Sequence, residues 1–188
     1  MEQLTAENIK EASKLGEQSA TKALSVLAKK SVSVQTTDVS LVDATSAKLS
    51  VEELEEHAVI AYMEALSGVT GVSVLALKRQ NALDLVDAFN NRPKGTTIVL
   101  QELDRSTVRE TLNILANAYI TEVAKYIKTT ILLSVPKITT KDKLNEIAQL
   151  AGVAKGGSAV LFQTKMSVED TGFDADLYFF FVTNLESK

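Results

Sequence analysis

Four polar side chains fall on one face of a predicted helix in the second half of the chain. Ser106, Glu110, Asn113 and Asn117 follow one another at intervals of four, three and four residues. Residues three and four apart share a face of an α-helix, so these four predict a single polar stripe. A carboxylate and a carboxamide side by side on a rigid helix can grip a cation and orient a water molecule. This is the chemistry of a hydrolytic site, and Pro136 follows Asn113 after 22 intervening residues.

On spacing alone, the stripe also has ordinary structural explanations. A Glu-x-x-Asn pair arises by chance about once in every couple of chains of this size. Thr107 and Glu110 fit a capping box at a helix start. Asn113 is compatible with a tolerated surface position, and Pro136 with the end of a strand. The spacing therefore needs support from the rest of the sequence.

The elements that would position the stripe are two long helices and a set of strands. Apolar residues at helical spacing predict a helix over 5–29 and a longer one over 104–128. The buried side of the second helix is predicted to be Val108, Leu112, Leu115, Tyr119 and Val123. Alternating or continuous apolar runs predict strands at 31–42, 57–66, 72–78, 131–138, 158–168 and 177–184. The last two form a hairpin around 169–176, short helices are predicted at 82–89 and 142–150, and a polar surface connection runs to Glu56.

The order of these elements predicts an internal duplication. Each half of the chain begins with a long helix followed directly by a strand, and a short helix and a strand pair come later in some order. The predicted fold class is α/β (α+β), one domain over 1–188, with halves of about 1–100 and 101–188 related by a pseudo-twofold axis. The halves share one sheet, and the long helices pack across it. Two equivalent surface sites are then expected, one on each long helix.

Composition excludes several classes of function. The chain has 188 residues, a net charge of −4 and no cysteine. The charge argues against nucleic acid as the main partner, and the missing cysteines exclude disulfides, thiolate zinc sites and cysteine nucleophiles. No signal peptide is apparent and no apolar run approaches the ~18 residues of a membrane span, so a cytoplasmic protein is expected. His57, the only histidine, is predicted to be a surface or strand-edge residue.

The motif and its surroundings resemble a known family. Ser106, Glu110, Asn113 and Pro136 match the signature of the CheC family of chemotaxis phosphatases. That signature is Asp or Ser, three residues, Glu, two residues, Asn, and a proline some 21 to 22 residues on. KLGEQSATKALSVLAKKSVSV resembles the family's first helix and strand, usually written around EVGNIGAGNAATALS, and ALDLVDAF after VSVLALK resembles a later helix. The resemblance covers nearly the whole chain.

The family carries two copies of the motif, and the first copy departs from the pattern here. Glu11 occupies the glutamate position, but Lys14 occupies the asparagine position, and no proline lies near Thr36 or Thr37. A lysine donates hydrogen bonds but cannot accept them, and its charge is repelled by a cation. The first site is therefore expected to be inactive, and the second to carry the activity.

The resemblance implies a phosphatase whose substrate is a phosphorylated CheY-type response regulator carrying an aspartyl phosphate. It implies that Asn113 enters the regulator's active site and holds the attacking water in line with phosphorus, as a glutamine does in small GTPases. It also implies that Glu110 forms a salt bridge to a lysine of that site. Mg²⁺ is expected to belong to the regulator, so no cofactor or metal site is expected on this chain.

The other motif residues are expected to lie at the contact with the regulator. Ser106 either hydrogen-bonds to a carbonyl four residues back or touches the edge of the contact. Asn117 is expected as a further contact without an assigned role. Pro136 is expected to shape the strand edge against which the regulator docks.

Two other functions compete with the phosphatase. The first is a catalytically weak CheC-like adaptor that binds the regulator or a CheD-type receptor deamidase. The second is a flagellar-switch component, because switch proteins of the FliY and FliM type contain this domain. It ranks last, since the chain is expected to leave no room after its last strand for the extra switch domain. The chain has the two-halved layout of the CheC family, and this resemblance implies a monomer.

Overall fold

The computed structural model describes residues 6–43, 57–68, 71–140 and 158–183. The helices and strands within these ranges are α1 (Ala6–Ala28), β1 (Val32–Asp43), β2 (Val59–Ser67), β3 (Val72–Leu77), α3 (Arg79–Phe89), α4 (Glu102–Tyr126), β4 (Leu132–Leu133), β5 (Lys137–Thr140), β6 (Ser158–Val168) and β7 (Phe173–Thr183). The predicted long helices and the strands β1, β2, β3 and β6 are confirmed to within two residues at each end. α3 begins three residues before its predicted start. The predicted connection to Glu56 and the predicted helix 142–150 lie outside the described residues.

Two predicted strands have different bounds in the structure. The single strand predicted at 131–138 is interrupted, because Pro136 has no N–H to donate to the neighbouring strand β2. The turn between β6 and β7 takes four residues, 169–172, in place of the predicted eight. Residues 173–176 extend β7 instead, since Phe173 and Ala175 are buried while Asp174 between them faces the solvent.

The sheet is antiparallel at every described strand pair, in the order β1-β6-β7-β3-β2-β4, and β5 also pairs with β2. This order reads symmetrically from its centre at β7 and β3. On each side, the strand that follows a long helix lies outermost, next to a strand from the other half of the chain. The predicted fold class, with long helices packed across one sheet that both halves share, is therefore confirmed. The division into one domain with a boundary near residue 100 stays a prediction.

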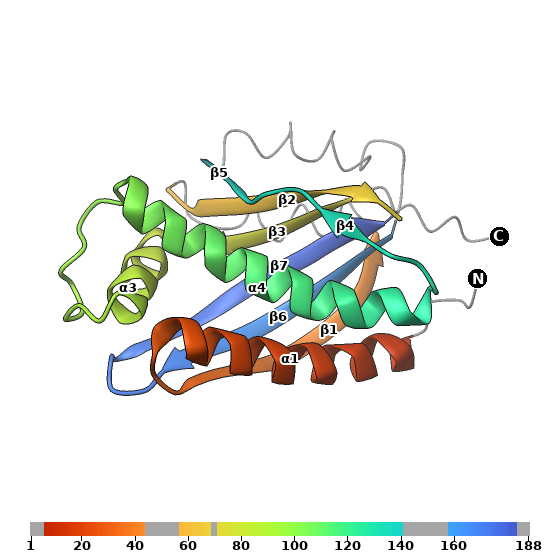
Figure 1. Cartoon of the computed structure of the whole chain (residues 1–188), viewed down its shortest axis with the longest axis horizontal. Helices are drawn as coiled ribbons and strands as arrows, with labels where there is room; N and C mark the ends of the chain where they lie inside the picture. The colour runs from red at the N-terminus through yellow and green to blue at the C-terminus, as the bar shows by residue number, and fades with distance from the viewer. Residues whose placement is uncertain (1–5, 44–56, 69–70, 141–157, 184–188) are drawn as a thin grey trace.

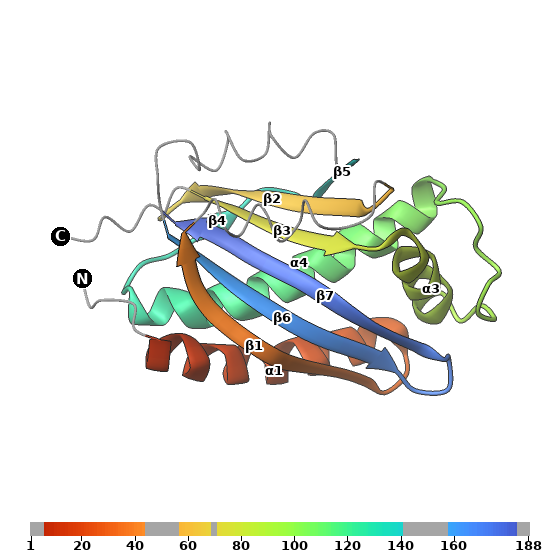
Figure 2. The same cartoon turned by 180° about the vertical axis from the view of Figure 1, so that it is seen from behind.

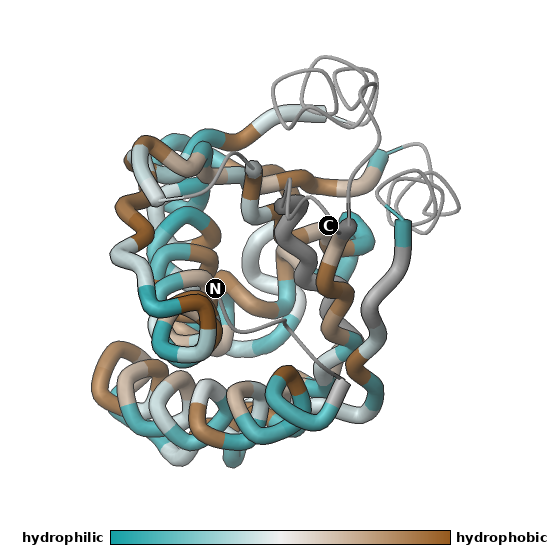
Figure 3. Tube along the Cα trace, turned by 90° about the vertical axis from the view of Figure 1, so that its right-hand side faces the viewer, coloured by the Kyte–Doolittle hydropathy of each residue, from teal (hydrophilic) through white to brown (hydrophobic). Residues whose placement is uncertain are grey.

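The two long helices lie side by side across one face of the sheet (Figure 1). Seen from behind, the strands cross in front of both helices, and α3 lies at one end of the sheet (Figure 2). In both helices, hydrophobic and hydrophilic residues are mixed along the tube (Figure 3), and the hydrophobic residues at three- and four-residue intervals are the buried ones. The fully buried large side chains at this interface include Leu24, Leu112, Leu115, Tyr119 and Phe162.

The two helices approach each other closely at Gly16 of α1. A Cβ atom at this position would lie 2.9 Å from Cδ1 and 3.0 Å from Cα of Tyr119 on α4. The Tyr119 ring also packs on Phe162 of β6, with 4.8 Å between ring centroids, and its hydroxyl shares a 2.9 Å hydrogen bond with Thr36 Oγ1 of β1. Tyr119 thus joins α4 to α1, β1 and β6.

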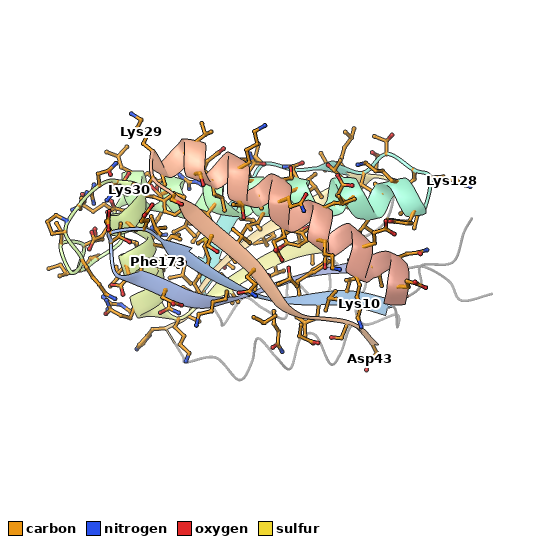
Figure 4. The ribbon with its side chains drawn as sticks, turned by 90° about the horizontal axis from the view of Figure 1, so that it is seen from below. Lys10, Lys29, Lys30, Asp43, Lys128 and Phe173 are labelled. Carbon is orange, nitrogen blue, oxygen red and sulfur yellow. The ribbon has the colours of Figure 1, made fainter. Side chains whose placement is uncertain are left out.

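A series of hydrogen bonds joins α1 to the strand that follows it. Backbone N–H groups of β1 donate to side chains of α1: Val32 to Ser25 Oγ (3.0 Å), Val34 to Thr21 Oγ1 (3.2 Å) and Thr36 to Glu17 Oε2 (2.8 Å). Four helical residues rise by about 6 Å and two strand residues by about 6.6 Å, so the two spacings match. Figure 4 shows α1 and β1 diverging from the reversal at Lys29 and Lys30.

We predict that Gly16→Val lowers the free energy of unfolding by about 2 kcal/mol or more, because the added carbons overlap the backbone and ring of Tyr119. The measurement is urea unfolding of both proteins. Ser19→Val, at an exposed position of the same helix, is the control and should change stability by less than about 1 kcal/mol. Equal effects of the two substitutions would contradict a tight α1–α4 contact.

Candidate functional site

α4 carries the whole polar stripe, and its first turn is capped. The carboxylate of Asp104 accepts a hydrogen bond from the backbone N–H of Gln101 (3.0 Å), so the helix begins at Glu102, two residues before its predicted start. Acidic residues in the first turn also suit the positive end of the helix dipole. The alternative explanation of Thr107 and Glu110 as a capping box is wrong, because both lie inside the helix.

Two buried carboxylates hold the segment between α3 and α4. Asp87 is 1% exposed and accepts hydrogen bonds from the N–H groups of Thr96 (2.8 Å) and Thr97 (3.0 Å) and from the Thr97 hydroxyl (2.6 Å). Asp104, 4% exposed, pairs with Arg92 at 2.8 Å, and Arg92 also donates to Thr97 Oγ1 at 3.1 Å. These bonds anchor the start of α4 to α3. The sequence interpretation missed this network, since no local spacing relates its members.

The buried side of α4 sets the direction of the stripe. All five residues predicted for that side are buried: Val108, Leu112, Leu115, Tyr119 and Val123. At about 100° per residue, these positions lie roughly opposite the stripe. The structure therefore turns the four predicted polar positions outward, with Ser106, Glu110 and Asn117 exposed and Asn113 half-buried.

At the start of the stripe, Ser106 is part of a small hydrogen-bonded group. Its hydroxyl donates to the carbonyl oxygen of Glu102 (3.2 Å), the bond expected for a serine inside a helix. Arg109 donates to Ser106 Oγ (2.9 Å) and to Glu102 Oε1 (2.6 Å). The hydrogen bond and charge of Arg109 lower the pKa of Glu102. The guanidinium of Arg109 therefore lies toward the start of the helix, where Glu102 and Ser106 accept its hydrogen bonds.

The centre of the stripe combines a free carboxylate with a held carboxamide. Within the described part of the chain, no hydrogen bond or ion pair engages the Glu110 carboxylate. Asn117 Nδ2 donates to both the backbone oxygen (2.8 Å) and Oδ1 (2.9 Å) of Asn113. The Asn-x-x-x-Asn spacing was the available signal for this pair. This face of α4 therefore offers a negatively charged carboxylate that can pair with a cationic group. One turn away it offers a carboxamide whose orientation is fixed by a hydrogen bond.

Pro136 lies half-buried between β4 and β5, and β5 contacts α4. Where the ladder to β2 is interrupted, Ser134 completes it. Its N–H donates to Glu64 O (2.8 Å), and its hydroxyl accepts from Glu64 N–H (2.9 Å). Val135, next to the proline, is 77% exposed. The predicted strand edge is present, and its role in docking stays a prediction.

The residues of the predicted first site lie apart from the second. Glu11 and Lys14 are both exposed on α1. The hydroxyl of Tyr126 on α4 hydrogen-bonds to Glu11, which raises the pKa of Tyr126. Tyr126 stands 16 residues beyond Glu110, about 24 Å along the helix axis. Glu11 and Glu110 therefore cannot act on the same small group.

The described residues also bear on the predictions for the histidine, for a metal site and for a membrane span. His57 is exposed, as predicted. Within the described ranges, no three His, Cys, Asp or Glu side chains are grouped so that they could hold a metal ion. None of the helices described is long and apolar enough to cross a membrane.

Comparison with known proteins shows which fold the chain has. No family model and no curated protein matches the sequence. Among solved structures, FliY from Thermotoga maritima matches with a TM-score of 0.73 and 20% identity, over 97% of this chain and 92% of that one. FliM in a FliG–FliM complex from H. pylori matches at 0.66 and 10%, over 96% and 94%. A CheC-like superfamily protein from Shewanella sp. PV-4 matches at 0.55 and 12%, over 95% and 98%.

These similarities show that the chain has the CheC/CheX/FliY-type fold, the fold named by the sequence resemblance. It is a fold shared by chemotaxis and flagellar proteins, and at identities of 10–20% the likeness concerns the fold alone. The roles of the individual stripe residues stay predictions.

The Asp87 network yields a prediction about stability and pH. Burial alone would raise the pKa of Asp87, but hydrogen bonds from Thr97, Thr96 and Gly95 outweigh burial and hold that pKa below its ordinary value. The stabilisation is therefore fully present above about pH 4, the unfolded-state pKa, and is lost as the pH falls through the folded-state pKa. We expect Asp87→Asn to lower the free energy of unfolding by about 1–3 kcal/mol at pH 7.

The same measurement supplies its own test. In urea unfolding between pH 7 and pH 3, the gap between wild type and Asp87→Asn should narrow below about pH 4. Asp38→Asn, at an exposed position, should show almost no gap at any pH. A gap of constant size would show that the Asp87 charge is not what the network stabilises.

Proposed function

We propose that this chain is a phosphatase that hydrolyses the aspartyl phosphate of a CheY-type response regulator, with its active site on α4. The observation that supports this most directly is the stripe itself. Glu110, whose carboxylate has no partner among the described residues, and the Asn113 carboxamide face outward from one helix, and the opposite side of that helix is buried in the core. Rigid placement of this kind is what a water-positioning residue requires.

A protein substrate fits this geometry better than a small molecule does. The outward face of a helix is a convex surface. The concave site that surrounds the phosphoryl group must therefore be part of the substrate. Exposed apolar residues at the start of α4 and just before it, Ile98, Val99 and Leu103, would add protein-contact area beside the stripe. Leu103 is 81% exposed and three residues before Ser106, on the same side of the helix.

The proposed reaction needs no nucleophile from this chain. Water attacks phosphorus, the bond to the aspartyl oxygen breaks, and the products are the free carboxylate and inorganic phosphate. Asn113 Oδ1 accepts a hydrogen bond from the water and fixes it in line. Glu110 pairs with a lysine of the regulator and sets the register of docking. The Mg²⁺ that neutralises the phosphoryl charge is the regulator's own.

The surrounding motif residues are assigned to docking. In the proposal, Ser106 and Pro136 border the contact, and the bond from Arg109 to Ser106 keeps the arginine away from Glu110. A free Glu110 is then available to the partner's lysine. The fold supports the assignment in general terms, since CheC-like and FliY structures share it.

A second candidate is an adaptor that docks the regulator or a CheD-type deamidase without turnover. The FliM match favours it, because that FliM is seen in a complex with FliG and so uses this fold to hold a protein partner. The two candidates differ in what Asn113 does. In the adaptor it is one contact among several, and in the phosphatase it acts only in the transition state.

The deciding experiment follows the decay of a phosphorylated CheY-type regulator with this protein at substoichiometric amounts. Asn113→Ala is expected to lower kcat by about 100-fold or more while leaving the affinity for the regulator within about 3-fold. Glu110→Ala should weaken binding as well as turnover. The control is Thr121→Ala, an exposed position two turns beyond Asn113. Binding without accelerated decay by the wild type would favour the adaptor.

The first site gives a separate prediction. Lys14→Asn restores the motif residue on α1, but the Glu11 carboxylate still accepts a hydrogen bond from Tyr126. We therefore expect no added activity from Lys14→Asn in an Asn113→Ala background. Adding Tyr126→Phe removes the competing donor, and any activity at the first site should appear only then. A gain from Lys14→Asn alone would contradict this dependence on Tyr126.

A further inference from the structure

The contact between Asn117 and Asn113 is the only side-chain to side-chain hydrogen bond that the described residues make to the proposed water-positioning group. Asn117 Nδ2 donates to Asn113 Oδ1 at 2.9 Å and to the Asn113 backbone oxygen at 2.8 Å. Both acceptors belong to the residue one turn back, so one amide group of Asn117 bridges the main chain and the side chain of Asn113. The bridge restrains the carboxamide relative to the helix backbone.

This bridge distinguishes the two orientations of a carboxamide. A primary amide can turn by 180° about its last bond, which exchanges its oxygen and nitrogen. Because Asn117 offers a donor, Asn113 must turn its oxygen toward Asn117 and its nitrogen away. Oδ1 has two lone pairs and Asn117 occupies one, so the other remains for a water molecule. Without the donor, the half-buried Asn113 would lose the preference for this orientation.

We infer that Asn117 is a positioning residue that sets the carboxamide of Asn113 in the orientation needed to hold the attacking water. The inference rests on the proposed phosphatase function and assigns to Asn117 a role in turnover. It acts through Asn113 and needs no contact with the regulator. This differs from the sequence-based expectation, in which Asn117 was a contact at the docking surface.

The test compares steady-state kinetics of wild type, Asn117→Ala and Asn117→Asp on the phosphorylated regulator. Loss of the donor in Asn117→Ala should lower kcat by about 3- to 10-fold and leave KM within about 2-fold. A carboxylate at this position only accepts, so in Asn117→Asp it would draw the nitrogen of Asn113 toward itself and expel the oxygen. The loss in kcat should therefore be larger in Asn117→Asp than in Asn117→Ala. Thr121→Ala, one turn beyond Asn117 and exposed, is the matched control and should leave both constants unchanged.

A second readout does not depend on activity. The ¹⁵N order parameter of the Asn113 side-chain amide should fall toward the flexible range, below about 0.6, in Asn117→Ala and stay at its wild-type value in Thr121→Ala. Alanine favours the helix more than asparagine does, so the loss cannot be attributed to a weaker helix.

The possible results separate this inference from the proposed function. A lower kcat with unchanged KM and a more mobile Asn113 amide supports the inference. A raised KM with unchanged kcat would make Asn117 a docking contact, and no change in either constant would also overturn the positioning role. A wild type without phosphatase activity would refute the proposed function, and the inference with it.

Discussion

The contact between Gly16 and Tyr119 is the constraint on which the rest of the structure depends. With no side chain at Gly16, α1 and α4 approach closely enough for the tyrosine ring to fill the crossing and reach the sheet. A helix held at one point by an aromatic ring and along its length by aliphatic side chains cannot rotate about its axis without opening the core. The direction of the outward face of α4 is therefore a result of packing on the inward face.

The two long helices occupy similar places in the fold but use their polar residues differently. On α1, several polar side chains form hydrogen bonds with other parts of this chain. Glu17, Thr21 and Ser25 bond to β1, and Glu11 bonds to Tyr126. On α4, the position equivalent to Glu11 is Glu110, and no hydrogen bond or ion pair from the described residues engages its carboxylate. In a fold with two similar halves, one long helix can thus serve the structure while the other is free to contact a partner. Lys14, which stands where the family pattern has asparagine, is consistent with a structural use of α1.

The sequence was sufficient for the features that depend on local periodicity. The five buried positions of α4 repeat at three- and four-residue intervals, which predicted both the helix and its outward stripe. Local patterns failed where distant residues decide the outcome. Phe173 and Ala175 belong to β7 because β6 pairs with them, although the aspartates around them are typical of a turn. Pro136 interrupts its strand because the missing N–H faces β2, and the sequence does not show which neighbour the strand will have.

In the candidate site, too, local spacing predicted some features and distant contacts decided others. Spacing placed the stripe residues on one face, and the family resemblance supplied their predicted roles. The bonds that hold them could not be predicted. Asp87, Arg92 and Asp104 are brought together by a loop whose path follows from burial and hydrogen bonding. The orientation of Asn113 depends on a donor that spacing allows but does not require.

The ladder from α1 to β1 also affects how the molecule behaves among its own copies. An outer strand with open N–H groups is a template for pairing with another chain. Here Val32, Val34 and Thr36 have already donated theirs to α1. On the opposite border of the sheet, Pro136 divides the outer strand into two short pieces. Growth of the sheet into fibrils by strand addition is therefore blocked at the start of β1 by a helix and hindered at the other border by a proline.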